Sequence, residues 1–260
     1  MKICVLIKQV PDKDSSFEVS SNNISIKTDT VTWVSNESDN YALEEALLIK
    51  EADKSAEVVV CTLGLETAHQ VLKDALAKGA DRAIHLCDPK FNELDILSKA
   101  KIFASVLKKE KFDLIFTGLQ SDDEGNSQLG LLLAELLDLS HASLVMGTEI
   151  VDNNNIKAKR ELENGWFQWT ELSIPASISI QSGINTPRYA TLKGIMMVKN
   201  KTIDKYTFED IEIGDIKSKS SVSKLYAPIK SKETKFIEGS NDEIASELLE
   251  LLKNEIKVVS

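Results

Sequence analysis

Short apolar runs alternate with segments of helical periodicity along the first half of the chain. The apolar runs cover residues 3–7, 58–62, 83–86 and 114–117. Their apolar residues are continuous rather than alternating, which is typical of strands buried on both faces of a parallel sheet. Apolar residues at spacings of three and four predict the helices that connect these strands. The predicted helices cover residues 40–50, 68–78, 95–109 and 129–137.

The second of these helices has recognisable ends. Thr67 and Gln70 have the spacing of a capping box, and Gly79 stands where a left-handed residue commonly ends a helix. Strands that alternate with such helices predict an α/β fold with a Rossmann-like, open and mainly parallel sheet.

The pattern changes after residue 143. Apolar and polar residues then alternate with period two, and turns rich in Asn and Gly separate the segments, as in consecutive hairpins. The alternating segments are 148–151, 156–160, 166–172 and 176–181. We therefore expect an antiparallel extension beside the parallel sheet.

The C-terminal part is polar and weakly patterned before it becomes helical. Ser240 and Glu243 form a second capping-box pair. The apolar residues that follow share one helical face: Ile244, Leu248, Leu251, Leu252 and Ile256. The chain thus divides into an α/β domain over 1–203 and an arm over 204–260, whose helix either packs on its own domain or clasps another subunit.

Composition narrows the class of protein. A net charge of −10 opposes nucleic-acid binding, because phosphate backbones would repel most of the surface. No apolar run approaches the roughly 20 residues of a membrane-spanning helix, and the first run is too short for a secretory signal. Cys4, Cys61 and Cys87 are widely spaced within apolar runs and form no Cys/His cluster, so a zinc site is not expected. A soluble protein of a reducing compartment is expected, cytoplasmic or, in a eukaryote, in the mitochondrial matrix.

One segment of this acidic chain has a positive net charge. Between Leu172 and Ile203 there is no Asp or Glu. The window holds four basic residues: Arg188, Lys193, Lys199 and Lys201. We interpret it as a docking surface that attracts an acidic partner and ends in a flexible apolar segment. The alternative is a buried strand and loop with solvated lysines.

Three loops are placed to bind a ligand, because open parallel sheets bind ligands at the carboxyl ends of their strands. The strongest is 117–130: Gly118 permits a sharp exit from the strand, and Gly125 permits a close approach of the backbone. Asn126 and Ser127 open the next helix, where backbone amides would face a phosphate. The other two loops are 62–67 and 36–39.

Three carboxylates complicate the strongest loop. Asp122, Asp123 and Glu124 oppose an anion unless they point away or bind ribose hydroxyls. An acid-rich helix cap without a ligand is the alternative. The sequence contains no Walker lysine motif, no GxGxxG, no Ser/His/Asp order and no metal cluster, so we do not expect an enzyme.

Several motifs together resemble the beta subunit of electron transfer flavoprotein. The most specific is Asn185-x-Pro-Arg-Tyr-Ala-Thr-Leu192, and Ala77-Lys-Gly-Ala-Asp-Arg82 is moderately specific. The resemblance covers nearly the whole chain. It also includes Val5-Leu-Ile-Lys-Gln-Val10, Ala42-Leu-Glu-Glu-Ala46, the 118–130 loop and Arg160-Glu161.

The resemblance implies a heterodimer in which an alpha subunit carries the redox-active FAD and the beta subunit holds a structural AMP. It places AMP against Leu6, Asn36, Asp39, Leu63, Gly118, Gln120, Asp122, Gly125, Asn126, Ser127, Gln128 and Leu129. The leading side-chain candidates are Asp122, Asn126, Ser127 and Gln128.

The resemblance also implies that residues 181–201 recognise flavin-dependent dehydrogenases, from which electrons pass to a downstream acceptor. The implied partner-binding residues are Glu161, Pro187, Arg188, Tyr189, Leu192, Ile195 and Met196. Pro187 and Arg188 would fix the loop, Leu192 would insert into the partner and the lysines would attract it. Glu161 matches a family glutamate implicated in positioning the flavin domain, and the C-terminal arm resembles the segment that wraps the alpha subunit.

Two other functions stay open. A bifurcating member of the same family would hold a second FAD in place of AMP. A stand-alone nucleotide-binding α/β protein would have no redox role, but it would leave the basic window and the C-terminal arm unexplained.

Overall fold

A computed structural model describes residues 1–92, 94–214, 216–228, 234–255 and 257. The chain divides into two compact units, Met1–Lys224 and Leu225–Ser260. The expected boundary between residues 203 and 204 falls inside a strand, β11 (Ile203–Tyr206), which belongs to the first unit. A four-residue strand with two charged positions has too little periodicity to be recognised from the sequence.

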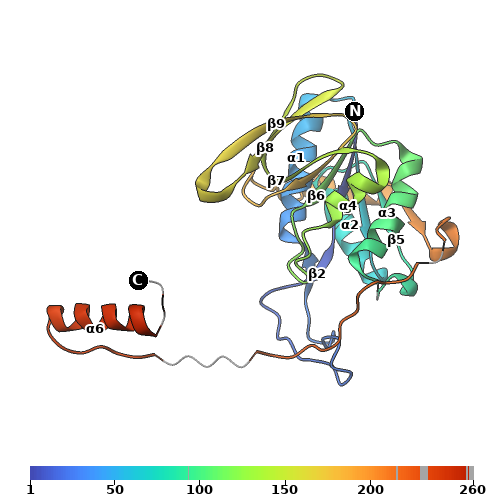
Figure 1. Cartoon of the computed structure of the whole chain (residues 1–260). Helices are drawn as coiled ribbons and strands as arrows, with labels where there is room; N and C mark the ends of the chain where they lie inside the picture. The colour runs from blue at the N-terminus through green and yellow to red at the C-terminus, as the bar shows by residue number, and fades with distance from the viewer. Residues whose placement is uncertain (93, 215, 229–233, 256, 258–260) are drawn as a thin grey trace. The chain divides into compact units, whose positions relative to one another are not determined.

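The first unit is built on a nine-stranded sheet in the order β11-β5-β4-β1-β6-β10-β7-β8-β9 (Figure 1). From β11 to β7 all neighbours pair in parallel. The parallel strands besides β11 are β1 (Lys2–Leu6), β4 (Glu57–Leu63), β5 (Arg82–Leu86), β6 (Leu114–Gly118), β7 (Ser140–Ile150) and β10 (Ala176–Ile180). The predicted mainly parallel α/β sheet is confirmed.

An antiparallel extension continues the sheet beyond β7. β8 (Asn155–Glu161) and β9 (Phe167–Ser173) pair with antiparallel geometry, as the period-two pattern predicts. A separate two-stranded antiparallel sheet consists of β2 (Gln9–Pro11) and β3 (Trp33–Ser35).

Helices cover both faces of the parallel sheet (Figure 1). α1 (Glu37–Ala52) and α2 (His69–Lys78) share a core cluster with one face, which includes Val5 of β1. α3 (Ile96–Glu110) and α4 (Leu129–Leu137) share a second cluster with the other face, which includes Leu6. Neighbouring residues of a strand point to opposite faces, so a continuous apolar run serves both clusters.

The expectation that 176–181 belongs to the antiparallel extension is wrong. β10 is buried throughout and runs parallel between β6 and β7. Its alternating serines face α4: Ser177 Oγ donates to the Gly130 carbonyl at 2.8 Å. A Cβ on Gly130 would lie 2.3 Å from Ser179 Oγ. The period-two pattern therefore marks small side chains beneath a closely packed helix, not a solvent-exposed face.

The expected capping box of α2 is also wrong. A short turn, Glu66–Ala68, precedes the helix, and no side chain caps its first residue. Thr67 Oγ1 instead donates to Gln9 Oε1 at 2.9 Å, and Gln70 Nε2 donates to Asp74 at 2.8 Å. The C-terminal end is confirmed, since Gly79 follows the helix with a φ of 138°.

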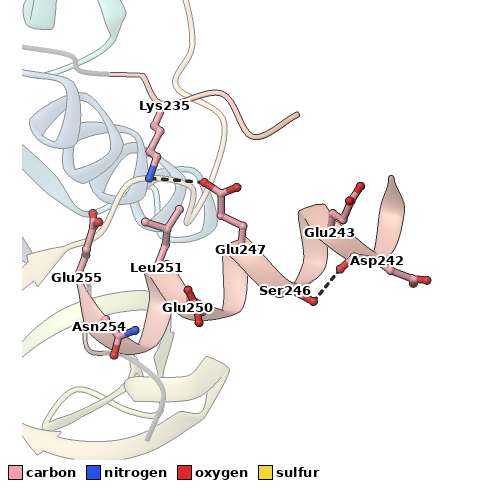
Figure 2. A pocket seen from close by; sticks show the side chains of 9 residues that line it. All are labelled: Lys235, Asp242, Glu243, Ser246, Glu247, Glu250, Leu251, Asn254 and Glu255. Carbon is pink, nitrogen blue, oxygen red and sulfur yellow. Dashed lines mark hydrogen bonds and ion pairs between the residues drawn. The ribbon is translucent and has the colours of Figure 1, made fainter. Parts of the chain in front are cut away.

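The second unit contains α6 (Asn241–Asn254), and its predicted capping box is confirmed. Ser240 Oγ and backbone N donate to Glu243 Oε2 at 2.7 and 2.8 Å. Acidic side chains line the helix, and Lys235 Nζ lies 3.6 Å from Glu247 Oε1 (Figure 2). No residue of α6 is buried. Ile256, which was expected on the same face, lies outside the described residues.

Candidate functional site

A cavity of about 600 Å³ lies at the carboxyl ends of β1, β4 and β6. This is the edge at which open parallel sheets bind ligands. Most residues that the resemblance assigns to a nucleotide line it: Leu6, Asn36, Asp39, Leu63, Gly118, Gln120, Asn126, Ser127, Gln128 and Leu129. Asp122 and Gly125 belong to the same loop but do not line the cavity.

Asn36 and Ser38 hold the loop after β6 against the start of α1. Asn36 Nδ2 and Ser38 Oγ both donate to the Gln120 carbonyl, at 2.9 and 2.8 Å. The backbone N–H of Asp122 donates to Asn36 Oδ1 at 2.9 Å. Asp122 Oδ2 in turn accepts from the backbone N–H of Glu37 at 3.2 Å. The polar groups of Asn36 and Asp122 therefore support the loop instead of pointing freely at a ligand.

Asp39 is buried where β1, α1 and β6 meet. Its carboxylate accepts from the backbone N–H groups of Lys8 at 2.7 Å and Gly118 at 3.0 Å. Burial raises the pKa of Asp39 to about 7, although these hydrogen bonds act in the opposite direction. A Cβ on Gly118 would lie 2.2 Å from Ser38 Oγ and 2.3 Å from Asp39 Oδ1. Only glycine lets β6 approach α1 this closely.

Two lysines line the cavity and face the acidic residues of its loop. Lys8 Nζ lies 2.7 Å from Asp123 Oδ1 and 3.5 Å from Glu124 Oε1, and Lys99 Nζ lies 2.9 Å from Glu124 Oε1. Burial is the largest single effect and raises the pKa of each carboxyl, but the Lys8 charge and the hydrogen bonds together outweigh it, so both pKa values are lowered. Neither lysine could be predicted as a site residue from local patterns, because Lys8 and Asp123 lie 115 positions apart in the chain.

The backbone just before α4 is shaped to bind an anion. Gly125 and Ser127 both have left-handed conformations, with φ values of 60° and 54°. Such turns create concave nests of backbone N–H groups, although the N–H of Gly125 itself donates to the Ser121 carbonyl at 2.9 Å. Gln128 makes no side-chain cap hydrogen bond, and the first N–H groups of a helix have no intrahelical acceptor. This end of the cavity can therefore bind one phosphate group through backbone N–H groups.

The side chains of Asn126 and Ser127 also line the cavity. Asn126 Nδ2 donates to Glu124 Oε2 and Ser127 Oγ donates to Gln120 Oε1, both at 3.1 Å. They are exposed, in contrast to Asn36, and can exchange these contacts for a ligand.

The segment between β2 and β3, together with the first residue of β3, lines another side of the cavity. No sequence motif predicts this position. Ser25, Ile26, Thr28 and Trp33 line the cavity. Within this segment Lys27 N donates to the Glu18 carbonyl at 2.8 Å. The segment has no helical or long alternating pattern, so its position over the cavity could not be predicted.

An exposed apolar surface surrounds α5 (Leu192–Met197), and we call it the α5 patch. It consists of Tyr189, Leu192, Ile195, Met196 and Met197. Leu192 is 82% exposed and Tyr189 is 93% exposed. The flexible apolar segment expected here is in fact a short helix capped by Thr191 Oγ1, which accepts from Gly194 N at 3.0 Å. Large contiguous apolar patches of this kind mark interaction sites.

Two of the four basic residues in the window are bound within the protein. Arg188 Nη2 lies 2.8 Å from Glu44 Oε1, and its Nη1 lies 2.6 Å from Glu51 Oε1. Lys201 Nζ donates to the carbonyls of Leu76 and Ala80, at the C-terminal end of α2. The positive surface of the window is therefore smaller than the sequence predicts and consists mainly of the exposed Lys193 and Lys199.

Gly194 sets the contact between α5 and α2. A Cβ at this position would lie 2.1 Å from the Ala77 carbonyl oxygen. The glycine permits close packing that fixes the α5 patch in place. Pro187 is half-buried just before the patch.

Glu161 lies at the end of β8, beside the start of the window. Its Oε2 accepts from Gln181 Nε2 at 3.2 Å. The neighbouring tryptophans are exposed, Trp166 by 72% and Trp169 by 52%. Glu161 thus lies in a region of exposed aromatic side chains and does not line the cavity.

The described residues contain no helix long and apolar enough to cross a membrane. Within the same residues, no group of three or more His, Cys, Asp or Glu side chains is arranged to hold a metal ion.

Comparison with known proteins gives a consistent result. The family model of the electron transfer flavoprotein domain matches residues 24–211. The chain is 36% identical to the electron transfer flavoprotein subunit beta of Methylophilus methylotrophus, over 99% of both chains. It is 31% identical to the subunit beta of Bacillus subtilis over the full length of both, and 30% identical to that of Mus musculus over 94% of this chain and 96% of the relative.

Proposed function

We propose, since the chain belongs to the electron transfer flavoprotein family as a beta subunit, that it pairs with an alpha subunit and binds AMP in the cavity. The α5 patch docks flavin-dependent dehydrogenases. The alpha subunit holds the FAD, which takes electrons from the dehydrogenase and passes them to a downstream acceptor. This chain binds AMP and the dehydrogenase and supports the alpha subunit that holds the FAD.

The shape and chemistry of the cavity support AMP. The nest before α4 suits a single phosphate group, and Ser127 can donate to it. Apolar side chains from four elements supply a surface for a purine ring: Leu6, Leu63, Phe103 and Leu129. Small-molecule sites typically combine such an apolar lining with a few placed polar groups.

The observation that carries the docking role is the exposure of Leu192 on a rigidly held helix. Burying one leucine side chain contributes roughly 1.5–3 kcal/mol. Millimolar to micromolar affinity corresponds to about 4–8 kcal/mol, so one anchor supplies a large share of what a transient complex requires. Lys193 and Lys199 add long-range attraction for an acidic partner.

The accessible apolar side chains of α6 support a role for the arm in subunit assembly. Leu248 and Leu249 are each about half exposed although the helix is well capped. An amphipathic helix with no buried residue is stabilised when its apolar side chains pack against another surface. The alpha subunit is the partner that we assign to it.

Co-expression with an alpha subunit tests the proposal. We expect a stable one-to-one complex that contains FAD, and reduction of that FAD when a flavin-dependent dehydrogenase and its substrate are added. A chain that purifies as a stable monomer beside an abundant alpha subunit would contradict the proposal and favour a nucleotide-binding protein without a redox role.

A further inference from the structure

The charges around the cavity determine how many phosphate groups its ligand can carry. The ionisable residues that line it are Lys8, Asp39, Asp88, Lys99, Asp123 and Glu124. Carboxyl groups outnumber ammonium groups, so the walls do not attract a polyanion. Sites for nucleoside triphosphates, in contrast, place a free lysine at the outer phosphates.

Neither ammonium group is free for a phosphate. Lys8 Nζ forms a 2.7 Å contact with Asp123 and a 3.5 Å contact with Glu124. Lys99 Nζ forms a 2.9 Å contact with the same oxygen of Glu124. Moving either lysine to a ligand would therefore break an ion pair that the loop already forms.

The favourable charge for an anion therefore comes from the backbone. The turn at Ser127 and the N-terminal end of the nine-residue α4 supply it. A helix terminus is equivalent to roughly half an elementary charge, which suits one phosphate group. Asp123 and Glu124 line the same cavity as Ser127 and Gln128, so a second or third phosphate group in the cavity would meet their negative charges.

We propose that Asp123 and Glu124 are specificity-determining residues that restrict the cavity to adenine nucleotides with one phosphate group. The inference rests on the proposed AMP site and names the residues that discriminate against ADP and ATP. Repulsion grows with each added phosphate, so the order of affinity is AMP, then ADP, then ATP.

Binding of AMP, ADP and ATP to the full-length chain, stripped of nucleotide, tests this inference by calorimetry. We expect AMP to bind at least about tenfold more tightly than ATP at low ionic strength. Glu124→Gln and Asp123→Asn should each reduce the AMP-to-ATP affinity ratio by about tenfold. Glu135→Gln is the matched control, because Glu135 is an exposed carboxylate of α4 that does not line the cavity.

A second measurement does not depend on how the variants fold. In the unmodified chain, raising the salt concentration should reduce the AMP-to-ATP ratio, because screening weakens the repulsion. A wild-type protein that binds ATP as tightly as AMP, or variants that keep the wild-type ratio, would overturn the inference while leaving the AMP site in place. A chain that binds none of the three nucleotides would overturn both.

Discussion

Arg188 binds both carboxylate oxygens of Glu44: its Nε and Nη2 atoms each lie 2.8 Å from one of them. The backbone N–H of Arg188 also donates to Glu44 at 3.1 Å. Glu44 is buried in α1, and the two residues are 144 positions apart. This ion pair attaches the segment before the α5 patch to the main core.

Removing the cation should destabilise the fold. Arg188→Ala leaves Glu44 buried without its partner, and we expect the free energy of unfolding to fall by about 2–4 kcal/mol, since Arg188 itself is partly exposed. Chemical denaturation of the full chain measures the change. Lys193→Ala is the control, because Lys193 is an exposed lysine of the same window and should change stability by less than about 0.5 kcal/mol. Equal stability of the two variants would show that the ion pair does not fix the segment.

Leu192 should matter for electron transfer and not for stability. Its side chain is almost fully exposed, so Leu192→Ala should leave the melting temperature unchanged. We expect the rate of electron transfer from a flavin-dependent dehydrogenase at sub-saturating concentration to fall about tenfold or more. Stopped-flow reduction of the heterodimer's FAD measures this rate. The control is Leu131→Ala, a partly exposed leucine of α4, and equal rates in both variants would argue against docking through the α5 patch.

Gly118 should be required for the nucleotide site. In Gly118→Ala the new Cβ must displace Ser38 or Asp39, and with them the loop that Ser38 holds. We expect a loss of about 1–3 kcal/mol in unfolding free energy and at least a tenfold weaker affinity for AMP. Gly214→Ala is a suitable comparison, because a Cβ there meets no atom within 4 Å. Normal AMP affinity in Gly118→Ala would mean that the loop position is not needed for binding.

His85 should make the protein sensitive to acid. Burial of the His85 side chain lowers its pKa below the usual value, although a backbone contact with Gly64 and the charge of Glu66 act in the opposite direction. The unfolded chain therefore takes up the proton at a higher pH than the folded chain. The contribution of His85 to stability is full above the unfolded pKa of about 6.5 and is lost as the pH falls below it.

Denaturation series between pH 8 and pH 5 test this prediction. His85→Leu cannot be protonated and should lose less stability than the wild type over this range. His141→Leu, at an exposed histidine, should retain the wild-type dependence on pH. If all three proteins respond equally to pH, His85 is not the group responsible.

Local patterns were sufficient to predict much of the parallel core. Continuous apolar runs gave β1, β4, β5 and β6, and the leucine spacing gave α4 with its observed bounds. The predicted loop after β6 does line the cavity, because the carboxyl edge of a parallel sheet is set by topology alone.

The errors share a physical cause, which is contact between residues far apart in the chain. β10 was misplaced because its serines pack under Gly130, and the charge of the window was overestimated because Arg188 meets Glu44. Lys8 was not recognised as a site residue because its carboxylate partners lie on another loop. The periodicity of apolar residues predicts the helix or strand to which a residue belongs. It does not predict which distant residue pairs with a buried charge or packs against a glycine.

The most direct test of the account is the identity of the nucleotide in the native complex. The heterodimer of this chain with its alpha subunit is purified without added nucleotide and denatured with acid, and the released compounds are quantified by chromatography and mass spectrometry. The account predicts equal amounts of AMP and FAD. Two equivalents of FAD with no AMP would contradict it and indicate a bifurcating flavoprotein, and FAD alone at one equivalent would show that the cavity at the carboxyl ends of β1, β4 and β6 does not hold a nucleotide.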